Sequence, residues 1–194
     1  MSKSIGVIAD GFGDFASVNA RFGSKCRVMK TDGPRGDSPT PEQVTRGAAK
    51  QICLLQAFGC KTIVLMLDLE ERSMSWTNFT NALVRCFSRT DYGPVVKVVV
   101  ANRMIENWYL ADIAYLSRKK AYIREHLQQK KYEGRHGKRV LKALFRPGQS
   151  YLETKHGPDM FKTIRLGIAG DNSPSLKCFL FAIGEPTGGV ASGG

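Results

Sequence analysis

The fold is decided by one stretch of the chain, Thr62-Ile63-Val64-Leu65-Met66-Leu67-Asp68-Leu69-Glu70. Its first six residues form a continuous apolar run, which predicts a buried, central strand of a parallel sheet over 62–67. An earlier apolar run, from Lys3 to Ala9, predicts another strand and is followed by Asp10-Gly11-Phe12-Gly13-Asp14. Carboxylates therefore follow two strands, at the strand ends where α/β proteins build their sites.

Strand and helix patterns alternate through the first half of the chain. Further strands are predicted at 25–30 and 95–100, and helices at 14–22, 40–58 and 75–88. The helix at 40–58 has a recognisable start, because Thr40 can cap it, Pro41 suits its first position and Gln43 can close a capping box. This alternation predicts an α/β fold with a four-stranded parallel sheet, right-handed crossovers and helices on both faces.

The pattern changes beyond residue 102. Residues 104–116 carry apolar side chains at helical spacing, and 119–142 is basic. A last helix should have Ser173 as its cap and Pro174 at its first position, and should run to Ile183. We therefore expect an α/β core over 1–117, a basic helical elaboration packed on it over 118–184, and a flexible tail over 185–194.

The positive charge is concentrated in one part of the chain. The formal net charge is +12, and from Arg118 to Arg165 fourteen Lys and Arg residues face four acidic ones. Such a stripe attracts a polyanion, and nucleic acid is favoured over a membrane because the chain has no long apolar run. The residues expected to contact nucleic acid are Lys130, Lys131, Arg135, Lys138, Arg139 and Lys142.

The cysteines and the start of the chain bear on its location. The five cysteines are an odd number without CxxC spacing, which favours reduced core thiols over disulfides or a zinc site. The first 20 residues lack the apolar segment of a signal peptide, because Asp10 and Asp14 interrupt it. We expect a cytoplasmic protein.

The acidic residues predict a metal site. In an extended strand Asp68 and Glu70 would point the same way, while Leu69 would turn into the core. If the first and third strands are neighbours, the turn after the first would bring Asp10 and Asp14 to the same edge. Oxygen ligands of this kind suit Mg²⁺ or Mn²⁺. In the alternative interpretation Asp10 forms a turn, Asp14 caps a helix and residues 70–72 form a solvated loop.

The same residues resemble a known pattern. Asp10-Gly11-x-x-Asp14, Asp68-x-Glu70 and Glu106-x-Trp108 follow the first, third and fourth strands and resemble the Toprim pattern of topoisomerases, primases and some nucleases. Residues 98–112 and 172–176 are similar to stretches of the small stand-alone, RloB-like Toprim proteins. The resemblance implies a Toprim-like core, Mg²⁺-dependent cleavage of DNA or RNA, and an ABC- or SMC-type ATPase partner in defence against phage.

The resemblance also implies roles for individual residues. Asp10 would be the general base or a metal ligand, Asp68 and Glu70 would be ligands, and Asp14 and Glu106 would support the metal. Two of these positions depart from the family, because Asp10 stands where the first motif normally has Glu, and Glu70 replaces the second Asp of Asp-x-Asp. Both exchanges keep an oxygen ligand but change its reach, which affects catalytic geometry more than metal binding.

Two other functions stay open at this point. The chain could be a catalytically inactive Toprim-like subunit that binds only nucleic acid or an ATPase. It could also be a receiver-like, Mg²⁺-binding signalling domain built on Asp10, Asp14 and Asp68. A receiver would have a free Lys at the end of its last strand, whereas Lys97 lies within the predicted strand. We expect Trp108 to be a core aromatic rather than a platform for nucleic-acid bases.

Overall fold

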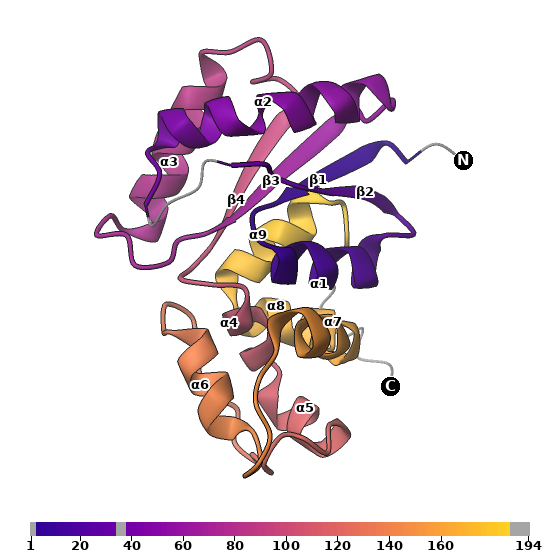
Figure 1. The fold of residues 1–194 in the computed structure, drawn as a ribbon, viewed down its shortest axis with the longest axis vertical. Helices are drawn as coiled ribbons and strands as arrows, with labels where there is room; N and C mark the ends of the chain where they lie inside the picture. Colours follow the sequence, from indigo (N-terminus) through magenta and orange to yellow (C-terminus); the bar gives the residue numbers. More distant parts are fainter. Residues whose placement is uncertain (1–2, 34–37, 187–194) are drawn as a thin grey trace, which may run out of the picture.

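A parallel sheet in the order β2-β1-β3-β4 forms the centre of the molecule (Figure 1). The computed structural model describes residues 3–33 and 38–186. The strands are β1 (Ile5–Ala9), β2 (Cys26–Lys30), β3 (Thr62–Asp68) and β4 (Val96–Ala101). Each of the four predicted strands is present, and the predicted α/β class is confirmed.

Helices cover both faces of the sheet, as predicted. In Figure 1 α2 (Pro41–Ala57) and α3 (Trp76–Ser88) lie on one face, and α1 (Phe12–Phe22) and α9 (Pro174–Ala182) lie on the other. Successive side chains of a strand point to opposite faces of the sheet. Leu65 therefore packs in the core under α2 and α3, while Val64 and Met66 pack on the side of α1 and α9. The sheet therefore has a continuous apolar core on each side.

The helix start at Thr40 has the predicted capping box. The Gln43 amide donates to the Thr40 hydroxyl at 3.3 Å, and the Thr40 amide donates to the Gln43 side chain at 2.8 Å. Pro41 occupies the first turn, where its missing N–H has no partner to lose. At the other end Gly59 adopts a φ of +83°, which favours glycine and ends the helix before β3.

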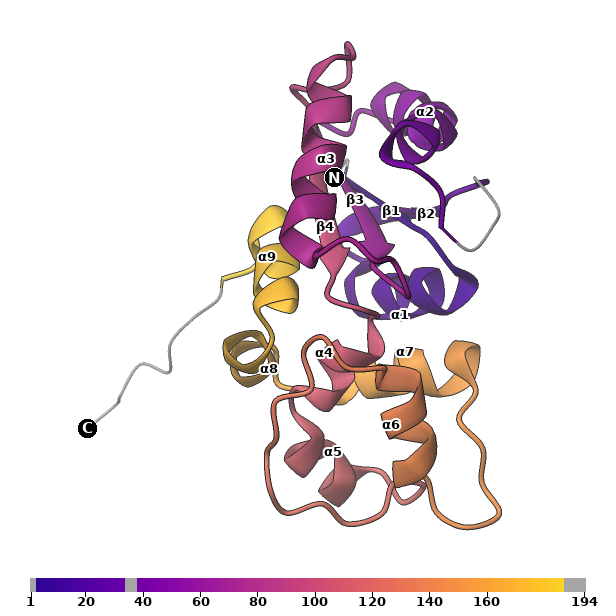
Figure 2. The same cartoon turned by 90° about the vertical axis from the view of Figure 1, so that its left-hand side faces the viewer.

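The second half adds a helical layer below the sheet in Figures 1 and 2. It contains α4 (Glu106–Leu110), α5 (Ile113–Lys119), α6 (Gly137–Leu144), α7 (Glu153–Thr163) and α8 (Leu166–Asn172). α7 lies along α1, and the helix predicted from Ser173 is present as α9. The apolar residues at helical spacing over 104–116 lie in two short helices, α4 and α5, and most of the basic stretch 119–136 is not helical.

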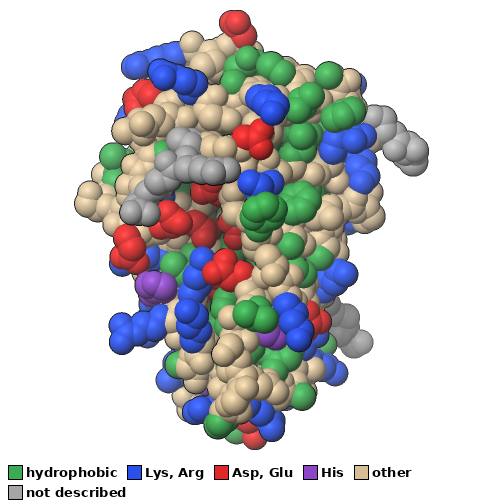
Figure 3. Space-filling view, in the orientation of Figure 1, with side chains coloured by type: hydrophobic (Ala, Val, Ile, Leu, Met, Phe, Trp, Pro, Cys, Tyr) green, Lys and Arg blue, Asp and Glu red, His purple; other side chains and the backbone are tan. Residues whose placement is uncertain are grey.

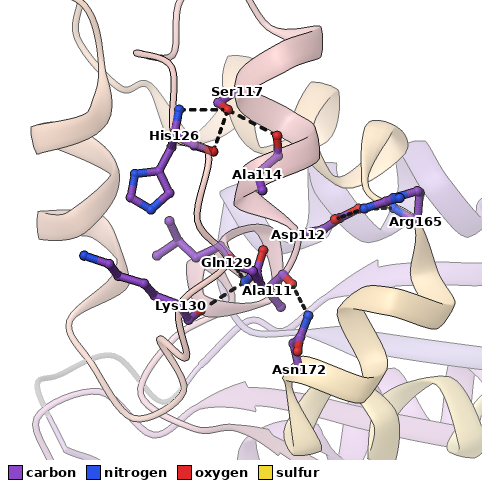
Figure 4. A network of polar contacts seen from close by, with 10 residues as sticks. Ala111, Asp112, Ala114, Ser117, His126, Gln129, Lys130, Arg165 and Asn172 are labelled. Atoms are coloured by element: carbon purple, nitrogen blue, oxygen red, sulfur yellow. Dashed lines mark hydrogen bonds and ion pairs between the residues drawn. The ribbon is translucent and has the colours of Figure 1, made fainter.

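An ion pair separates α4 from α5. Asp112 has φ −130° and ψ 39°, outside the helical range, and its buried carboxylate accepts hydrogen bonds from the Arg165 side chain at 2.7 and 3.0 Å. Figure 4 shows this pair beside a polar network that fixes the segment after α5. There the Ser117 hydroxyl bridges the backbone of His126, and Gln129 donates to the Leu110 carbonyl at 3.1 Å. The basic segment is thus anchored through its backbone without a helix.

Several smaller predictions have definite outcomes. All five cysteines are free; Cys26 and Cys60 are in the core as predicted, but Cys53 and Cys178 are exposed. Trp108 is fully buried, and its Nε1 donates to the Ser175 hydroxyl at 2.8 Å, which confirms a core role. Within 3–33 and 38–186 no helix is both long and apolar enough to cross a bilayer. The predicted tail lies outside the described residues from 187 onward.

Candidate functional site

The strand order brings the ends of β1, β3 and β4 to one edge of the sheet. β1 pairs with β3, so the two strands followed by carboxylates are neighbours, as the metal-site prediction required. Asp68 is the last residue of β3 and pairs with Ala101, and Glu106 starts the helix that follows β4. The carboxyl ends of parallel strands meet at such an edge, where α/β folds place their sites.

Asp68 is held rigidly at this edge. Its side chain is almost fully buried, and its Oδ1 accepts a hydrogen bond from the Ile105 amide at 2.9 Å. Burial raises the pKa of Asp68 well above its usual range, and the nearby carboxylates of Asp14 and Glu106 raise it further. A neutralising group is therefore favourable at this position.

Asp14 reaches the same place from α1. Its Oδ2 accepts a hydrogen bond from the Gly11 amide at 3.3 Å, so the carboxylate also satisfies the first turn of the helix. Burial raises the pKa of Asp14 to about 7, Glu106 adds to the rise, and the Gly11 hydrogen bond opposes it. The structure thus brings Asp14, Asp68 and Glu106 close enough to influence one another's protonation.

Glu106 is the deepest of the three carboxylates, with 1% of its surface exposed. Its Oε1 accepts a hydrogen bond from the Tyr151 hydroxyl at 3.0 Å, while Oε2 is buried and has no hydrogen-bond partner within the described residues. Burial raises the pKa of Glu106, and the Lys138 ammonium lowers it. A buried carboxylate oxygen without a partner is costly, so Oε2 marks a position for a cation or a donor.

Lys138 lies differently from the other basic residues that were predicted to bind nucleic acid. Its ammonium pairs with Glu153 at 3.0 Å, and it acts electrostatically on Glu106 and Asp68. The approach of α6 depends on Gly137, because a Cβ there would lie 2.8 Å from Asn107 Oδ1. Lys138 therefore acts on the carboxylates from α6, in the helical layer below the sheet in Figure 1.

Asp10 and Glu70 are more exposed than Asp68 and Glu106. Burial raises the pKa of Asp10, and the cations of Arg72 and then Lys30 lower it. The extended conformation expected at Glu70 is wrong, because β3 ends at Asp68 and Glu70 has a left-handed φ of 52°. The Glu70 side chain is 47% exposed and lies 3.7 Å from Arg72, while Leu69 turns into the core as expected.

Arg72 is a site residue that the sequence did not reveal. The interpretation of 70–72 as a solvated loop is wrong for Arg72, whose side chain is buried over the ring of Phe79 at 4.6 Å. It donates to the backbone carbonyls of Asp68 and Leu69 at 3.0 and 2.9 Å. A charged residue in a polar run gives no sequence signal of burial, because its binding partners are backbone oxygens.

A basic surface adjoins the carboxylates. Figure 3 shows Asp and Glu side chains gathered near the middle of one face, with Lys and Arg side chains directly below them. The exposed residues of the predicted nucleic-acid surface are Lys130, Lys131, Arg135, Arg139 and Lys142. Asn107 donates to the Arg135 carbonyl at 2.9 Å, which ties this surface to the residue next to Glu106.

The candidate ligands fit a hard divalent cation that is held by few protein side chains and completes its coordination with water or phosphate. All the candidate ligands are carboxylate oxygens, which Mg²⁺ and Mn²⁺ prefer, and Glu106 Oε2 has a free position. Within residues 3–33 and 38–186 no three His, Cys, Asp or Glu side chains are arranged around a single ion. Mg²⁺ is commonly held by one or two carboxylates with water and substrate phosphate, and Asp68 and Glu106 would supply two.

Comparison with known proteins does not indicate a family or a function. No family model, curated protein or solved structure matches the chain. The function is therefore argued from the site and its surroundings.

Proposed function

We propose that this protein is a Mg²⁺- or Mn²⁺-dependent nuclease that hydrolyses phosphodiester bonds in DNA or RNA. The observation that carries the proposal is the convergence of Asp14, Asp68 and Glu106 at one sheet edge, with a buried and unpartnered oxygen on Glu106. The adjoining basic surface supports it, because a phosphate backbone would lie there without any need for base-specific contacts.

The proposed roles follow from the position of each side chain. Asp68 and Glu106 would hold the cation, with Asp14 beside them. When bound, the ion would polarise the scissile phosphate and help to ionise water. Asp10 would accept a proton from that water, because burial raises the pKa of its carboxyl and so makes the carboxylate a stronger base, while Arg72 and Lys30 oppose part of that rise. Glu70 would add negative charge near Asp68, on which it acts electrostatically, and Lys138 would limit the repulsion among the carboxylates.

Cleavage and metal binding test the proposal together. We expect Mn²⁺-dependent cleavage of a labelled oligonucleotide by the wild type, a loss of at least about 100-fold with Asp68→Asn, and saturable Mn²⁺ binding in calorimetry. Asp171→Asn, which removes an exposed carboxylate on α8, is the matched control and should cleave normally. Equal cleavage by wild type and Asp68→Asn in EDTA would overturn the proposal.

A second function is favoured by Lys138. Its ammonium already neutralises part of the carboxylate group, through Glu153 and its field on Glu106 and Asp68. A chain with this resident cation could bind nucleic acid or an ATPase without cleaving. This alternative predicts salt-sensitive binding to nucleic acid, no Mn²⁺ isotherm and no cleavage, all in the same preparation.

The five free cysteines fit a reducing compartment, and the resemblance to RloB-like proteins suggests a partner. We propose a cytoplasmic location and an ABC- or SMC-type ATPase partner that restrains or positions the nuclease in defence against phage. A basic nuclease without control would endanger the nucleic acid of its own cell. Full cleavage activity of the isolated chain at physiological salt would count against a restraining partner.

A further inference from the structure

Phe12 is a large aromatic side chain that the fold leaves in solvent. It is the first residue of α1, and 69% of its surface is exposed. The buried residues of α1 are Gly13, Ser17, Val18 and Phe22. At 100° per residue Phe12 points away from this stripe, so core packing does not explain an aromatic residue here.

Phe12 lies at the carboxylate edge of the sheet. It is two residues from Asp10 and two from Asp14, at the start of α1 directly after the turn that follows β1. The Lys30 ammonium, at the end of β2, lies over its ring at 4.5 Å and also acts on Asp10. An exposed ring, a cation and a candidate catalytic carboxylate therefore lie side by side.

Three other aromatic residues near the carboxylates cannot present a ring to a ligand. Trp108, Tyr109 and Tyr151 are buried. Their polar atoms are also engaged, Trp108 with Ser175, Tyr109 with Ser17 and Tyr151 with Glu106. Trp76 at the start of α3 is partly buried and donates to the Val100 carbonyl at 2.6 Å, so the exposed ring beside Asp10 and Asp14 is that of Phe12.

We propose that Phe12 is a stacking platform for an unpaired base, so that the site takes single-stranded rather than duplex nucleic acid. The inference rests on the proposed function in taking nucleic acid as the ligand. In a duplex both faces of each base are covered by neighbours, whereas an unpaired base can lie on the ring. Lys30 is placed to contact the adjacent phosphate. Phenylalanine has no hydrogen-bonding group, so the preference is for unpaired bases of any identity.

Fluorescence anisotropy in EDTA tests the inference separately from cleavage. The probes are a labelled oligonucleotide of about 15 nucleotides, as DNA and as RNA, and the duplex of each. We expect tighter binding of the single strand, and a loss of about tenfold for the single strand but not the duplex with Phe12→Ala, the size of one stacked base. Phe12→Tyr keeps the ring and should retain the affinity of the wild type.

Phe58 provides a matched control. It is 48% exposed and has the Arg27 guanidinium 4.2 Å from its ring centre, but it lies at the end of α2, before the amino end of β3. Phe58→Ala should leave single-strand affinity unchanged. An equal loss with Phe12→Ala and Phe58→Ala, or no loss with Phe12→Ala, would overturn the inference.

The remaining outcomes separate the two proposals. Phe12-dependent binding of single strands without cleavage in Mn²⁺ would support the stacking platform and count against the nuclease. Normal cleavage and binding by Phe12→Ala would leave the nuclease standing and overturn the platform. Failure of the wild type to bind single strands would also overturn it, as would self-association that Phe12→Ala abolishes while single-strand affinity is unchanged.

Discussion

Replacement of Asp14 by Asn should stabilise the metal-free protein in a way that depends on pH. Burial raises the pKa of Asp14 from 3.8 to about 7, so the folded state holds a proton that the unfolded state releases. The protonated carboxyl contributes its full stability below pH 3.8 and loses it as the pH rises to about 7. Asn carries no charge at any pH and can still accept the hydrogen bond from Gly11.

The size of the effect follows from the pKa. At about 1.4 kcal/mol for each pKa unit, ionisation of Asp14 lowers the free energy of unfolding by at most about 4 kcal/mol above pH 7. Asp14 retains some contact with solvent, which screens part of this destabilisation. We therefore use half of the maximum value. Asp14→Asn should therefore be more stable than the wild type by about 1 kcal/mol at pH 5 and about 2 kcal/mol at pH 8.

Urea unfolding in EDTA at these two pH values measures the difference, and Mg²⁺ provides a second readout. Mg²⁺ should stabilise the wild type by mass action and the variant less, because the variant has lost one of the charges that attract the ion. Asp171→Asn, an exposed control, should differ from the wild type by less than about 0.5 kcal/mol at both pH values. A stability difference for Asp14→Asn that is zero, or that shrinks from pH 5 to pH 8, would refute the convergence of buried carboxylates.

Three other variants test separate parts of the structure. Gly137→Ala should lower the free energy of unfolding by about 1 to 3 kcal/mol and reduce cleavage, because its Cβ would lie 2.8 Å from Asn107 Oδ1 and from Glu106 Cβ. Arg165→Ala should lower it by about 3 kcal/mol, since Asp112 keeps its burial and loses its cation. The double variant Arg139→Ala and Lys142→Ala should weaken nucleic-acid binding equally across sequences, with a salt slope smaller by about two.

Each variant has a matched control. Gly170→Ala meets only Leu180 Cδ1 at 3.4 Å and should be neutral in urea unfolding. Lys177→Ala removes an exposed ion pair and should change stability by less than about 1 kcal/mol. The control for the basic surface is Arg85→Ala with Arg89→Ala on the α3 side, which should leave the salt slope unchanged. If a variant and its control change the free energy of unfolding or the salt slope equally, the contact removed by that variant does not cause the change.

The strands and the first helices could be predicted because their signals are local. Continuous apolar runs predicted β1 and β3, and the capping residues around Thr40 and Ser173 predicted the starts of α2 and α9. The break at Asp112 could not be found, because its cause is Arg165, 53 residues away. α7 was not predicted at all, since Pro158 in its interior argues against a helix.

The candidate site was predictable only in outline. The sequence placed Asp10, Asp14 and Asp68 after two strands but left the adjacency of those strands as a condition, which the pairing of β1 with β3 meets. The left-handed turn at Glu70 depends on the Arg72 and Arg103 side chains, whose guanidinium groups bind backbone carbonyls around it. Lys138 and Tyr151 reach Glu106 through tertiary packing of α6 and the segment before α7. No pattern of residue spacing in the sequence predicts that Lys138 and Tyr151 lie beside Glu106.

The span of these contacts along the chain has a consequence for protein synthesis. The carboxylates follow β1, β3 and β4, but Tyr151 and the Lys138–Glu153 pair that organise Glu106 come much later. The α9 layer that completes one face of the sheet is later still. A ribosome releases these segments in order, so a nascent chain holds its acidic residues long before the groups that position them. Under the proposed function, cleavage competence should therefore arise only after Tyr151, Glu153 and α9 have left the ribosome, and chains terminated before these segments should be inactive.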